Sequence, residues 1–403
     1  MTKSRPVATR RTILRGMAAL AAASAGPLPA GAAGEPLRLG VLTPLTGAGS
    51  ADGPRMLKAM QAVAAEVNAA GGVLGRQIEL VVADGETNPD SAVKAARKLI
   101  DIDKIPVIMG TWASAVTTAV APLCWESKVF LTTVSGADTI TKLPHQGYLI
   151  RTQPNNHLQA THHADFIAAL GMKRVFALSI QAPFAVPTQE RLRERLKEKG
   201  SALIGSLIYD KDKTSYRSEI DGALKANPDM LYLNGYAPDV TVVLKELYKA
   251  GYTGGKFTQS YALTPKILAS LPPDVTDGTY TVQPSADVDS PAYAAAVKRL
   301  DIAEPDSYEC QATDWISLVC LAIAKAKEAT GTALRDNVRK ISQGSGQKVY
   351  TAVEGLKLLA AGKEINYEGA SGPCDFNEIG DILDCKFRFL KAEKGKFAFV
   401  KVA

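Results

Sequence analysis

Short apolar runs alternate with helical patterns from Leu37 onward, and this alternation limits the possible folds more than any other feature. Four runs have the length and β-branched composition of buried strands: LRLGVLT (37–43), QIELVVAD (77–84), PVIMG (106–110) and VFLTTV (129–134). The segments between them have apolar residues at helical spacing: 54–70, 89–100 and 114–126. Because strands that alternate with helices usually pair in parallel, the pattern predicts an α/β fold with a doubly wound sheet.

The same alternation starts again near residue 173, which predicts a second α/β unit of similar design. Its expected strands are KRVFALSI (173–180), ALIGSLIY (202–209), DMLYLN (229–234) and KFTQS (256–260). Helical stretches follow Tyr280, and the last expected strand is KFAFVKV (396–402). A length of 403 residues accommodates two domains. We therefore expect two Rossmann-like lobes with a cleft between them: residues 36–153 with 285–366, and residues 154–284 with 367–403.

The first 33 residues have the features of an export signal: a basic start, a short apolar core and an A-x-A end. Arg10 and Arg11 resemble the twin-arginine type, although Ile13 stands where that motif usually has Phe, so the general secretory route stays open. This signal predicts a periplasmic protein. The segment carries five basic residues and no acidic one, so the mature chain has a net charge near +1, against +6 for the whole. The charge therefore gives no reason to expect a nucleic-acid partner.

The chain has five cysteines, and export makes disulfides permissible. The run GPCDFNEIGDILDCKF (372–387) is typical of a hairpin whose turn lies near Gly380. A hairpin would place Cys374 and Cys385 across from one another, so this pair is the disulfide candidate. The alternative is two free thiols, because connectivity cannot be deduced from sequence alone.

No catalytic, cofactor or metal motif accompanies this pattern. The G-x-S-x-G elbow, the G-x-G-x-x-G fingerprint and the P-loop do not occur. His157, His162 and His163 lack the spacing of a metal site, so we interpret them as surface or polar-core residues. We therefore predict that the chain is not an enzyme and binds no cofactor or metal. The remaining enzyme hypothesis is a secreted serine hydrolase that uses Ser114 or Ser135 as nucleophile.

Small, polar and aromatic residues follow several expected strands, at the point where each strand ends. Gly110 and Trp112 follow the third strand, Gly136 follows the fourth, and Tyr236 lies in a similar loop of the second unit. Backbone N–H groups at helix starts favour a carboxylate, and aromatic side chains supply apolar walls. Each loop alone is also explained by capping and turn formation. Trp112 caps nothing, so it indicates either a ligand contact or packing under a neighbouring loop.

The chain resembles the type I periplasmic solute-binding proteins of ABC importers, in the branched-chain amino-acid (leucine/isoleucine/valine-binding) family. The motifs that carry the resemblance are LRLGVLTPLTG (37–47), NAAGGVLGRQIELVVADGETNPDSAV (68–93), VIMGTWASAVTTAVAP (107–122), LTTVSGAD (131–138) and DMLYLNGYAPD (229–239). The resemblance implies two lobes that are joined by three crossovers and close on a ligand by a hinge. It also implies delivery of a small solute to a membrane permease and its ATPase, with no chemistry performed.

The resemblance assigns roles to particular positions of this sequence. Ser114 corresponds to the serine that holds the ligand carboxylate, and Tyr261 to an acidic residue that pairs with the ligand's amino group. The other matched positions are the carboxylate- and ammonium-binding loop and two aromatic walls: Ser135, Gly136 and Ala137, and Phe184 and Tyr236.

Two of these positions depart from the family pattern, because Ala137 lacks a hydroxyl and Tyr261 lacks a carboxylate. An ammonium without a counter-charge is costly to desolvate, and only Asp52 or Asp239 could substitute. With Trp112 included, the expected site suits a flat or apolar carboxylic acid, or a neutral amide, at least as well as leucine. We expect a monomeric substrate-binding protein of an importer. The alternative is a ligand-sensing subunit of a membrane receptor.

Overall fold

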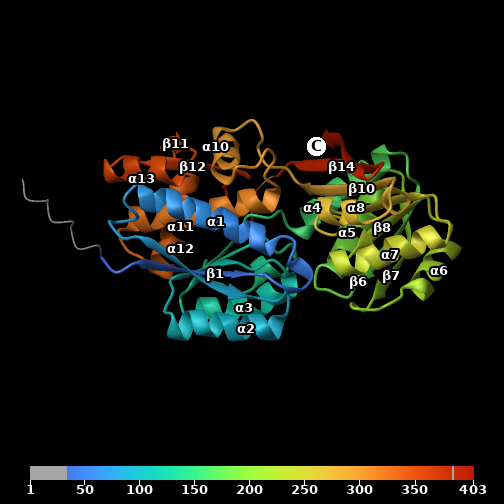
Figure 1. The fold of residues 1–403 in the computed structure, drawn as a ribbon, viewed down its shortest axis with the longest axis horizontal. Coiled ribbons are helices and arrows are strands. Elements are labelled where there is room, and N and C mark those ends of the chain that lie inside the picture. The colour runs from blue at the N-terminus through green and yellow to red at the C-terminus, as the bar shows by residue number, and fades with distance from the viewer. Residues whose placement is uncertain (1–33, 384) are drawn as a thin grey trace, which may run out of the picture.

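The computed structural model describes residues 34–383 and 385–403, so the expected export signal at residues 1–33 lies outside the described part. Two α/β lobes lie side by side along the long axis of the molecule (Figure 1). Each lobe is built around its own sheet, and the two sheets share no strand. The fold is therefore the predicted α/β class with two Rossmann-like lobes.

The first lobe contains a five-stranded sheet in the order β2-β1-β3-β4-β5, and all of its pairings are parallel. Its strands are β1 (Leu37–Thr43), β2 (Ile78–Asp84), β3 (Val107–Gly110), β4 (Phe130–Thr133) and β5 (Leu149–Arg151). Its helices are α1 (Gly53–Ala69), α2 (Pro89–Arg97), α3 (Ser114–Glu126), α10 (Pro291–Leu300), α11 (Ser307–Ala326), α12 (Gly331–Ser342) and α13 (Ala352–Ala360). A small sheet completes this lobe, with β11 (Gln347–Val349), β12 (Ile365–Gly369) and β13 (Gly372–Pro373).

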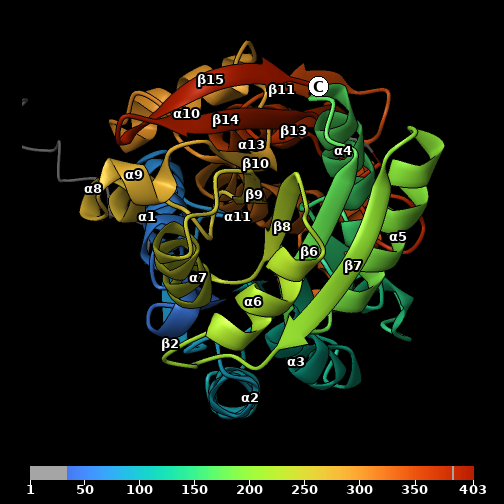
Figure 2. The same ribbon diagram turned by 90° about the vertical axis from the view of Figure 1, so that its right-hand side faces the viewer.

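The second lobe contains a seven-stranded sheet in the order β15-β14-β10-β9-β8-β6-β7, in which only the pairings of β14 with β10 and with β15 are antiparallel. Its strands are β6 (Arg174–Ile180), β7 (Ala202–Tyr209), β8 (Met230–Asn234), β9 (Gly255–Gln259), β10 (Thr279–Pro284), β14 (Phe387–Glu393) and β15 (Lys396–Val402). Its helices are α4 (Asn156–Ala169), α5 (Ala185–Glu198), α6 (Arg217–Lys225), α7 (Ala237–Lys249), α8 (Pro265–Ser270) and α9 (Pro273–Thr276). Figure 2 shows α5 and α7 on opposite faces of this sheet. Three short helical turns lie at Gly47–Gly49, Lys98–Ile102 and Ile140–Lys142.

The strand order fixes where each lobe presents its loops. In the first sheet the chain leaves β1 toward β2 on one side and returns to β3 on the other. In the second sheet, β6 stands in the same relation to β7 and β8. A crevice opens at the carboxyl ends of strands where the winding direction reverses, and ligands bind there in open α/β sheets. The loops after β1, β3, β6 and β8 are therefore the ones that the topology selects for binding.

The last return to the second lobe occurs later in the chain than the expected boundary at residue 367. The strand β12 pairs with β11 of the first lobe and with β13, and the Phe376 carbonyl accepts a hydrogen bond of 3.0 Å from Gln343 at the C-terminal cap of α12. Asp314 of α11 also accepts hydrogen bonds from the backbone N–H groups of Ala370 and Ser371. These contacts hold residues 367–383 against the first lobe, so only the segment from Phe387 onward joins the second sheet.

The expected disulfide between Cys374 and Cys385 is not present, because Cys374 is a free and fully buried thiol. The predicted hairpin does form, with an antiparallel bridge between Phe376 and Ile382. In this register, residues at equal distances before and after Ile379 face one another. Cys374 lies five residues before Ile379 and Cys385 lies six residues after it, so the two cysteines are one residue out of register. A one-residue offset turns side chains to opposite faces of a hairpin, so the sulfur atoms do not meet.

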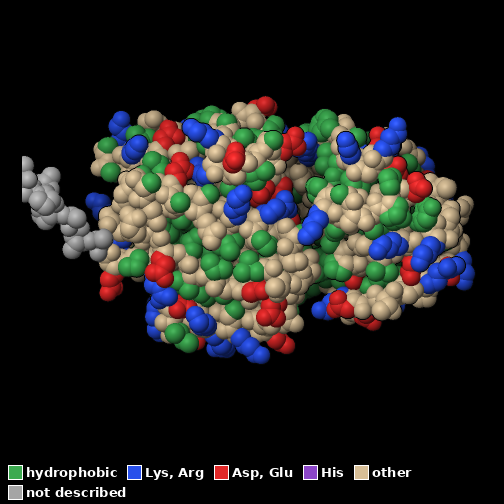
Figure 3. Space-filling model, viewed as in Figure 1, with side chains coloured by type: hydrophobic (Ala, Val, Ile, Leu, Met, Phe, Trp, Pro, Cys, Tyr) green, Lys and Arg blue, Asp and Glu red, His purple; other side chains and the backbone are tan. Residues whose placement is uncertain are grey.

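Figure 3 shows acidic and basic side chains interspersed over both lobes on the face in view. Within residues 34–383 and 385–403, no helix combines the length and the hydrophobicity that crossing a bilayer requires. The same part of the chain holds no cluster of His, Cys, Asp and Glu that could bind a metal ion.

Candidate functional site

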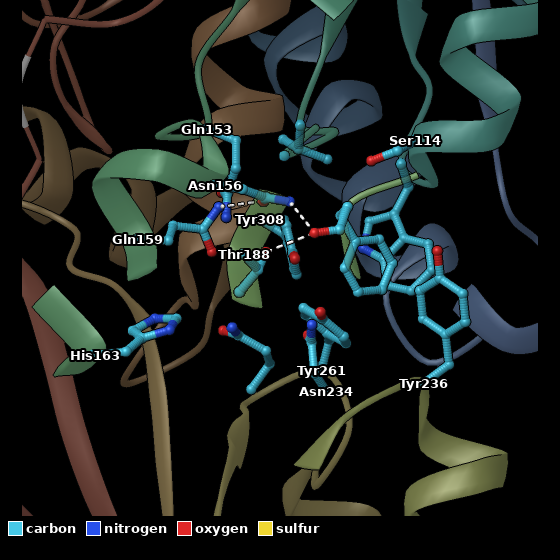
Figure 4. Close-up of a pocket in the computed structure, with 15 residues that line it drawn as sticks. Ser114, Gln153, Asn156, Gln159, His163, Thr188, Asn234, Tyr236, Tyr261 and Tyr308 are labelled. Carbon is cyan, nitrogen blue, oxygen red and sulfur yellow. Dashed lines mark hydrogen bonds between the residues drawn. The ribbon is translucent and has the colours of Figure 1, made fainter. Parts of the chain in front are cut away.

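A cavity of about 40 Å³ lies between the lobes, at the loops that the topology selects. The first lobe contributes Trp112, Ser114, Val134, Gly136 and Gln153 at its strand ends, and Tyr308 of α11. The second lobe contributes residues of α4 and α5, together with Phe184, Asn234, Tyr236, Gln259 and Tyr261 from its strand-end loops. Figure 4 shows these side chains converging from both lobes. Six of the nine ligand-contact residues predicted from the sequence line this cavity: Trp112, Ser114, Gly136, Phe184, Tyr236 and Tyr261.

A tight turn between β3 and α3 directs Trp112 and Ser114 into the cavity. Gly110 has a φ of +123°, and a Cβ atom there would lie 2.3 Å from the Leu42 carbonyl oxygen, so only glycine fits. The Ser114 Oγ accepts a hydrogen bond of 3.2 Å from the Ala137 N–H, which leaves its own proton to donate. Ser114 also starts α3, whose first N–H groups lack intrahelical partners. This end of the cavity therefore has the donors that a carboxylate needs.

The three residues of the loop 135–137 contribute differently to this end of the cavity. The Ser135 hydroxyl donates to the Trp112 carbonyl at 2.9 Å, and Ser135 does not line the cavity. Ala137 is fully buried and reaches the site only through its N–H contact with Ser114. Beneath the loop, the buried Arg151 Nη1 donates to the carbonyls of Ser135 and Ala137 at 3.1 and 2.7 Å. Ser135 and Ala137 thus shape the loop, and Gly136 presents its backbone to the cavity.

Aromatic rings from both lobes meet across the cavity. The centroid of Trp112 lies 5.2 Å from that of Tyr236 and 5.5 Å from that of Tyr261, and the Tyr261 ring meets it edge-on. Phe184 lies 5.8 Å from Tyr236, and Tyr308 lies 6.4 Å from Trp112. Such tilted and edge-to-face pairs are the favoured geometries for aromatic contacts. Trp112 also rests on Gly49, where a Cβ atom would lie 2.9 Å from the indole ring. Trp112 therefore both packs under a neighbouring loop and forms a cavity wall.

A polar stripe on α4 forms another wall that the sequence interpretation missed. Asn156, Gln159 and His163 line the cavity and are spaced by three and four residues, which places them on one face of the helix. The Asn156 N–H donates to the Gly136 carbonyl at 2.8 Å, which joins this stripe to the loop of residues 135–137. The spacing was visible in the sequence, but the histidines were tested only for metal-ligand patterns. His163 is indeed a polar-core residue, and it also faces the cavity.

Three buried side-chain nitrogens of the cavity lining have no hydrogen-bond partner within the described chain: Trp112 Nε1, His163 Nε2 and Asn234 Nδ2. The other ring nitrogen of His163, Nδ1, lies 3.0 Å from the Tyr232 hydroxyl. Burial lowers the pKa of His163 to about 3, with a smaller contribution from His162, so the imidazole is neutral at physiological pH.

Asp52 does not line this cavity, contrary to the prediction. It lies in a neighbouring cavity of about 520 Å³ that shares only Tyr261 and Tyr308 with the central one. Its carboxylate bonds to Arg55 at 2.6 Å, and burial raises its pKa to about 7. Asp52 starts α1 and is held there by its partner, so it supplies no counter-charge to the central cavity. None of the described residues that line the central cavity is Asp, Glu, Lys or Arg.

Comparison with known proteins agrees with this geometry. The family model described as "Periplasmic binding protein" matches residues 36–396. The chain belongs to this family. The chemotactic signal transduction system substrate-binding protein BasB of Halobacterium salinarum is 31% identical over 364 residues, which is 85% of this chain and 84% of BasB.

Two solved structures of periplasmic binding proteins share the fold. The leucine-binding protein LivK of Thermotoga maritima has a TM-score of 0.78 at 22% identity, and covers 91% of this chain and 98% of its own. An ABC transporter solute-binding protein of R. palustris in complex with benzoate has a TM-score of 0.72 at 19% identity, over 91% and 96% of the two chains. These two structures show the fold of type I periplasmic binding proteins, and the family match agrees with the resemblance to the branched-chain amino-acid family. The R. palustris protein is described as a solute-binding protein of an ABC transporter, whereas BasB is named as part of a chemotactic signal transduction system.

Acid should destabilise this periplasmic binding protein partly through His163. The pKa of His163 falls from an ordinary 6.5 to about 3 on folding. Between these two pH values the imidazole binds a proton in the unfolded chain but not in the folded chain, so acid favours unfolding. The stability contributed by the neutral imidazole is complete above pH 6.5 and is lost as the pH falls toward 3. At pH 5 the loss is about 2 kcal/mol. Chemical unfolding of the wild type and of His163→Gln between pH 4 and 8 measures this loss. The free energy of unfolding should fall more steeply with decreasing pH in the wild type than in the variant. His157→Gln, at an exposed histidine, should keep the wild-type slope.

Proposed function

We propose that this chain is the periplasmic substrate-binding component of an ABC importer, whose ligand is a small aromatic carboxylic acid without an ammonium group. Trp112, Ser114, Gly136, Phe184, Tyr236 and Tyr261 contact the ligand, while Ser135 and Ala137 shape the carboxylate loop. The protein performs no chemistry and needs no cofactor. Capture of the solute between the lobes shifts the equilibrium from the open to the closed form, and the permease recognises the closed form.

The observation that carries this proposal is the chemistry of the cavity lining. The Ser114 hydroxyl and the start of α3 offer donors to a carboxylate at one end, and aromatic rings from both lobes form the walls. No described acidic side chain lines the cavity to pair with an ammonium, and a buried unpaired ammonium is strongly disfavoured. Leucine therefore fits less well than an aromatic acid. The R. palustris protein of the same fold, which was solved in complex with benzoate, supports this choice of ligand class.

A thermal-shift screen of the mature protein tests the ligand class. The panel contains benzoate, phenylpropanoate, leucine, valine, glutamate and benzamide. A ligand at a hundred times its Kd stabilises a protein by about 2.7 kcal/mol, which raises the melting temperature by a few degrees. We expect benzoate or phenylpropanoate to give this shift and leucine to give none. Stabilisation by leucine and valine alone would overturn the aromatic-acid assignment, and no shift with any solute would overturn solute binding.

We further propose that residues 1–33 direct export through a twin-arginine-like signal, and that the mature protein acts as a monomer with a membrane permease and ATPase. The basic Arg10-Arg11 pair before an apolar run supports this route. Accumulation of the protein outside the inner membrane should stop when both arginines are replaced by lysine. Continued export of that variant would point to the general secretory route.

A ligand-sensing role is a second candidate, because the 31% identical BasB is named as part of a chemotactic signal transduction system. The two roles share the same cavity and differ in what the closed protein contacts. A strain that lacks this chain separates them by uptake of labelled ligand and by swimming toward that ligand. Loss of uptake supports the importer, whereas loss of chemotaxis with normal uptake supports the sensor.

A further inference from the structure

Within the described chain, two of the three unpaired nitrogens of the cavity lining come from the second lobe, on His163 of α4 and on Asn234 at the end of β8. His163 and Asn234 are 0% and 1% exposed, and both line the cavity. His163 Nε2 and Asn234 Nδ2 have no partner, although buried polar groups in folded proteins are almost always paired. A buried donor that stays unpaired costs its full desolvation free energy, so a ligand atom that accepts from both would be strongly favoured.

The hydrogen bonds behind His163 define which of its ring nitrogens carries the proton. Burial raises the pKa of Tyr232, so its hydroxyl keeps its proton at physiological pH, and the contact with Gln259 offsets only part of that rise. The Tyr232 O–H is then directed to His163 Nδ1, 3.0 Å away. A neutral imidazole that accepts at Nδ1 carries its proton on Nε2. His163 therefore presents an N–H donor to the cavity, as Asn234 does with its amide N–H.

His163 lies well away from the carboxylate end of the cavity. Figure 4 shows Ser114 and His163 on opposite sides of the cavity, with Thr188 and Tyr308 between them. We propose that His163 and Asn234 form a second binding subsite, which accepts an oxygen substituent at the end of the ligand remote from its carboxylate. This inference rests on the proposed function and narrows its ligand class to ring-oxygenated aromatic acids, such as acids with a para hydroxyl group.

Matched ligand pairs test the subsite by isothermal titration calorimetry. Hydroxyl and methyl groups are similar in size, so 4-hydroxybenzoate is compared with 4-methylbenzoate, and 3-(4-hydroxyphenyl)propanoate with 3-(4-methylphenyl)propanoate. We expect at least about tenfold tighter binding of the hydroxylated member in the pair whose length fits. Equal binding within both pairs would overturn the subsite and leave the proposed function intact. If no acid of either pair binds, the proposed function and the subsite both fail.

Three substitutions locate the effect on the named donors. Asn234→Asp keeps the side-chain shape but replaces the donor with an acceptor, so the hydroxyl preference should fall about tenfold or more. His163→Gln retains a terminal N–H and should keep part of the preference. Tyr232→Phe removes the hydroxyl that positions His163, and it should weaken binding of the hydroxylated acid while sparing the methylated one. Tyr252→Phe, whose hydroxyl donates to Gly255 in the same lobe, is the matched control and should change neither.

The protonation of His163 is measured independently of any variant's stability. The chain has four histidines, so their ring nitrogens can be resolved by long-range ¹H–¹⁵N correlation spectroscopy of the wild type. We expect the Nε2–H form for His163, with the Nδ1 resonance of an acceptor. The Nδ1–H form would make Nε2 an acceptor and would overturn the assignment of this subsite to a ligand oxygen that only accepts.

Discussion

Replacement of Arg151 by methionine should destabilise the protein by about 3–5 kcal/mol, the usual cost of breaking a buried ion pair. The Arg151 side chain is 0% exposed, and its Nε and Nη2 donate to Asp381 at 2.8 and 2.5 Å. Methionine would leave the buried Asp381 carboxylate without its cationic partner, and among the described side chains only the Asn155 Nδ2 donor at 3.3 Å would remain to it. Thermal unfolding followed by circular dichroism measures the loss, which corresponds to a fall of roughly 5 °C or more in melting temperature.

Arg151 should also affect ligand binding, because it joins the site to the crossover segment near residue 381. The same guanidinium that binds Asp381 also holds the carbonyls of Ser135 and Ala137. Arg151→Met should therefore raise the Kd for the ligand as well as lower stability. Pairing it with Asp381→Leu removes the stranded carboxylate and should restore part of the stability but not the affinity.

An exposed ion pair provides the control for this prediction. Arg217 and Asp221 lie one turn apart on α6 with side chains 61% and 50% exposed. Arg217→Met should cost less than about 1 kcal/mol, because solvent screens such pairs. A similar small loss in Arg151→Met would show that the buried pair contributes little, and that the loop of residues 135–137 is held by its other contacts.

The alternation of strands and helices was sufficient to predict the α/β class and the two lobes, because parallel strand–helix units have few alternative arrangements. The segment 367–383 was assigned to the wrong lobe because its attachment depends on Asp314, which lies more than fifty residues earlier. The disulfide failed for a similar reason. The hairpin was predictable from its turn residues, but its register, which decides whether Cys374 meets Cys385, was not.

Some residues of the candidate site were predictable from local sequence, whereas others are brought there only by the tertiary fold. Ser114 and Tyr236 follow strands directly, so the topology alone brings them to the crevice. Tyr308 comes from the start of α11, nearly two hundred residues after Trp112, and no local pattern connects the two. Asp52 was predicted to contact the ligand because an ammonium group would need a counter-charge. The structure instead places Asp52 outside the central cavity, where it is paired with Arg55.

Contact between rings of opposite lobes indicates how the aromatic wall responds to closure. Trp112 belongs to the first lobe, whereas Tyr236 and Tyr261 belong to the second, and their centroids lie within 5.5 Å of Trp112. A hinge movement that opens the cleft would separate these rings and expose them to water. Trp112 is therefore covered by rings of the opposite lobe as well as by Gly49 and Tyr308 of its own lobe, in contrast to a tryptophan packed inside one lobe.

Trp112→Ala should weaken ligand binding by about tenfold to a thousandfold, the range for truncating a central aromatic contact, while costing little folding stability. The reason is that two of its aromatic neighbours, Tyr236 and Tyr261, lie across the cleft, whereas Gly49 and Tyr308 are its neighbours in its own lobe. Titration calorimetry with the acid that stabilises the wild type measures the affinity, and thermal unfolding without ligand measures the folding stability.

Trp315 is the matched control, because it is 0% exposed inside the first lobe and its Nε1 donates to Thr152 at 2.9 Å. Trp315→Ala should lose about 3–5 kcal/mol of stability. If Trp112→Ala loses as much stability and keeps its affinity, then Trp112 is a core residue and the ligand binds elsewhere.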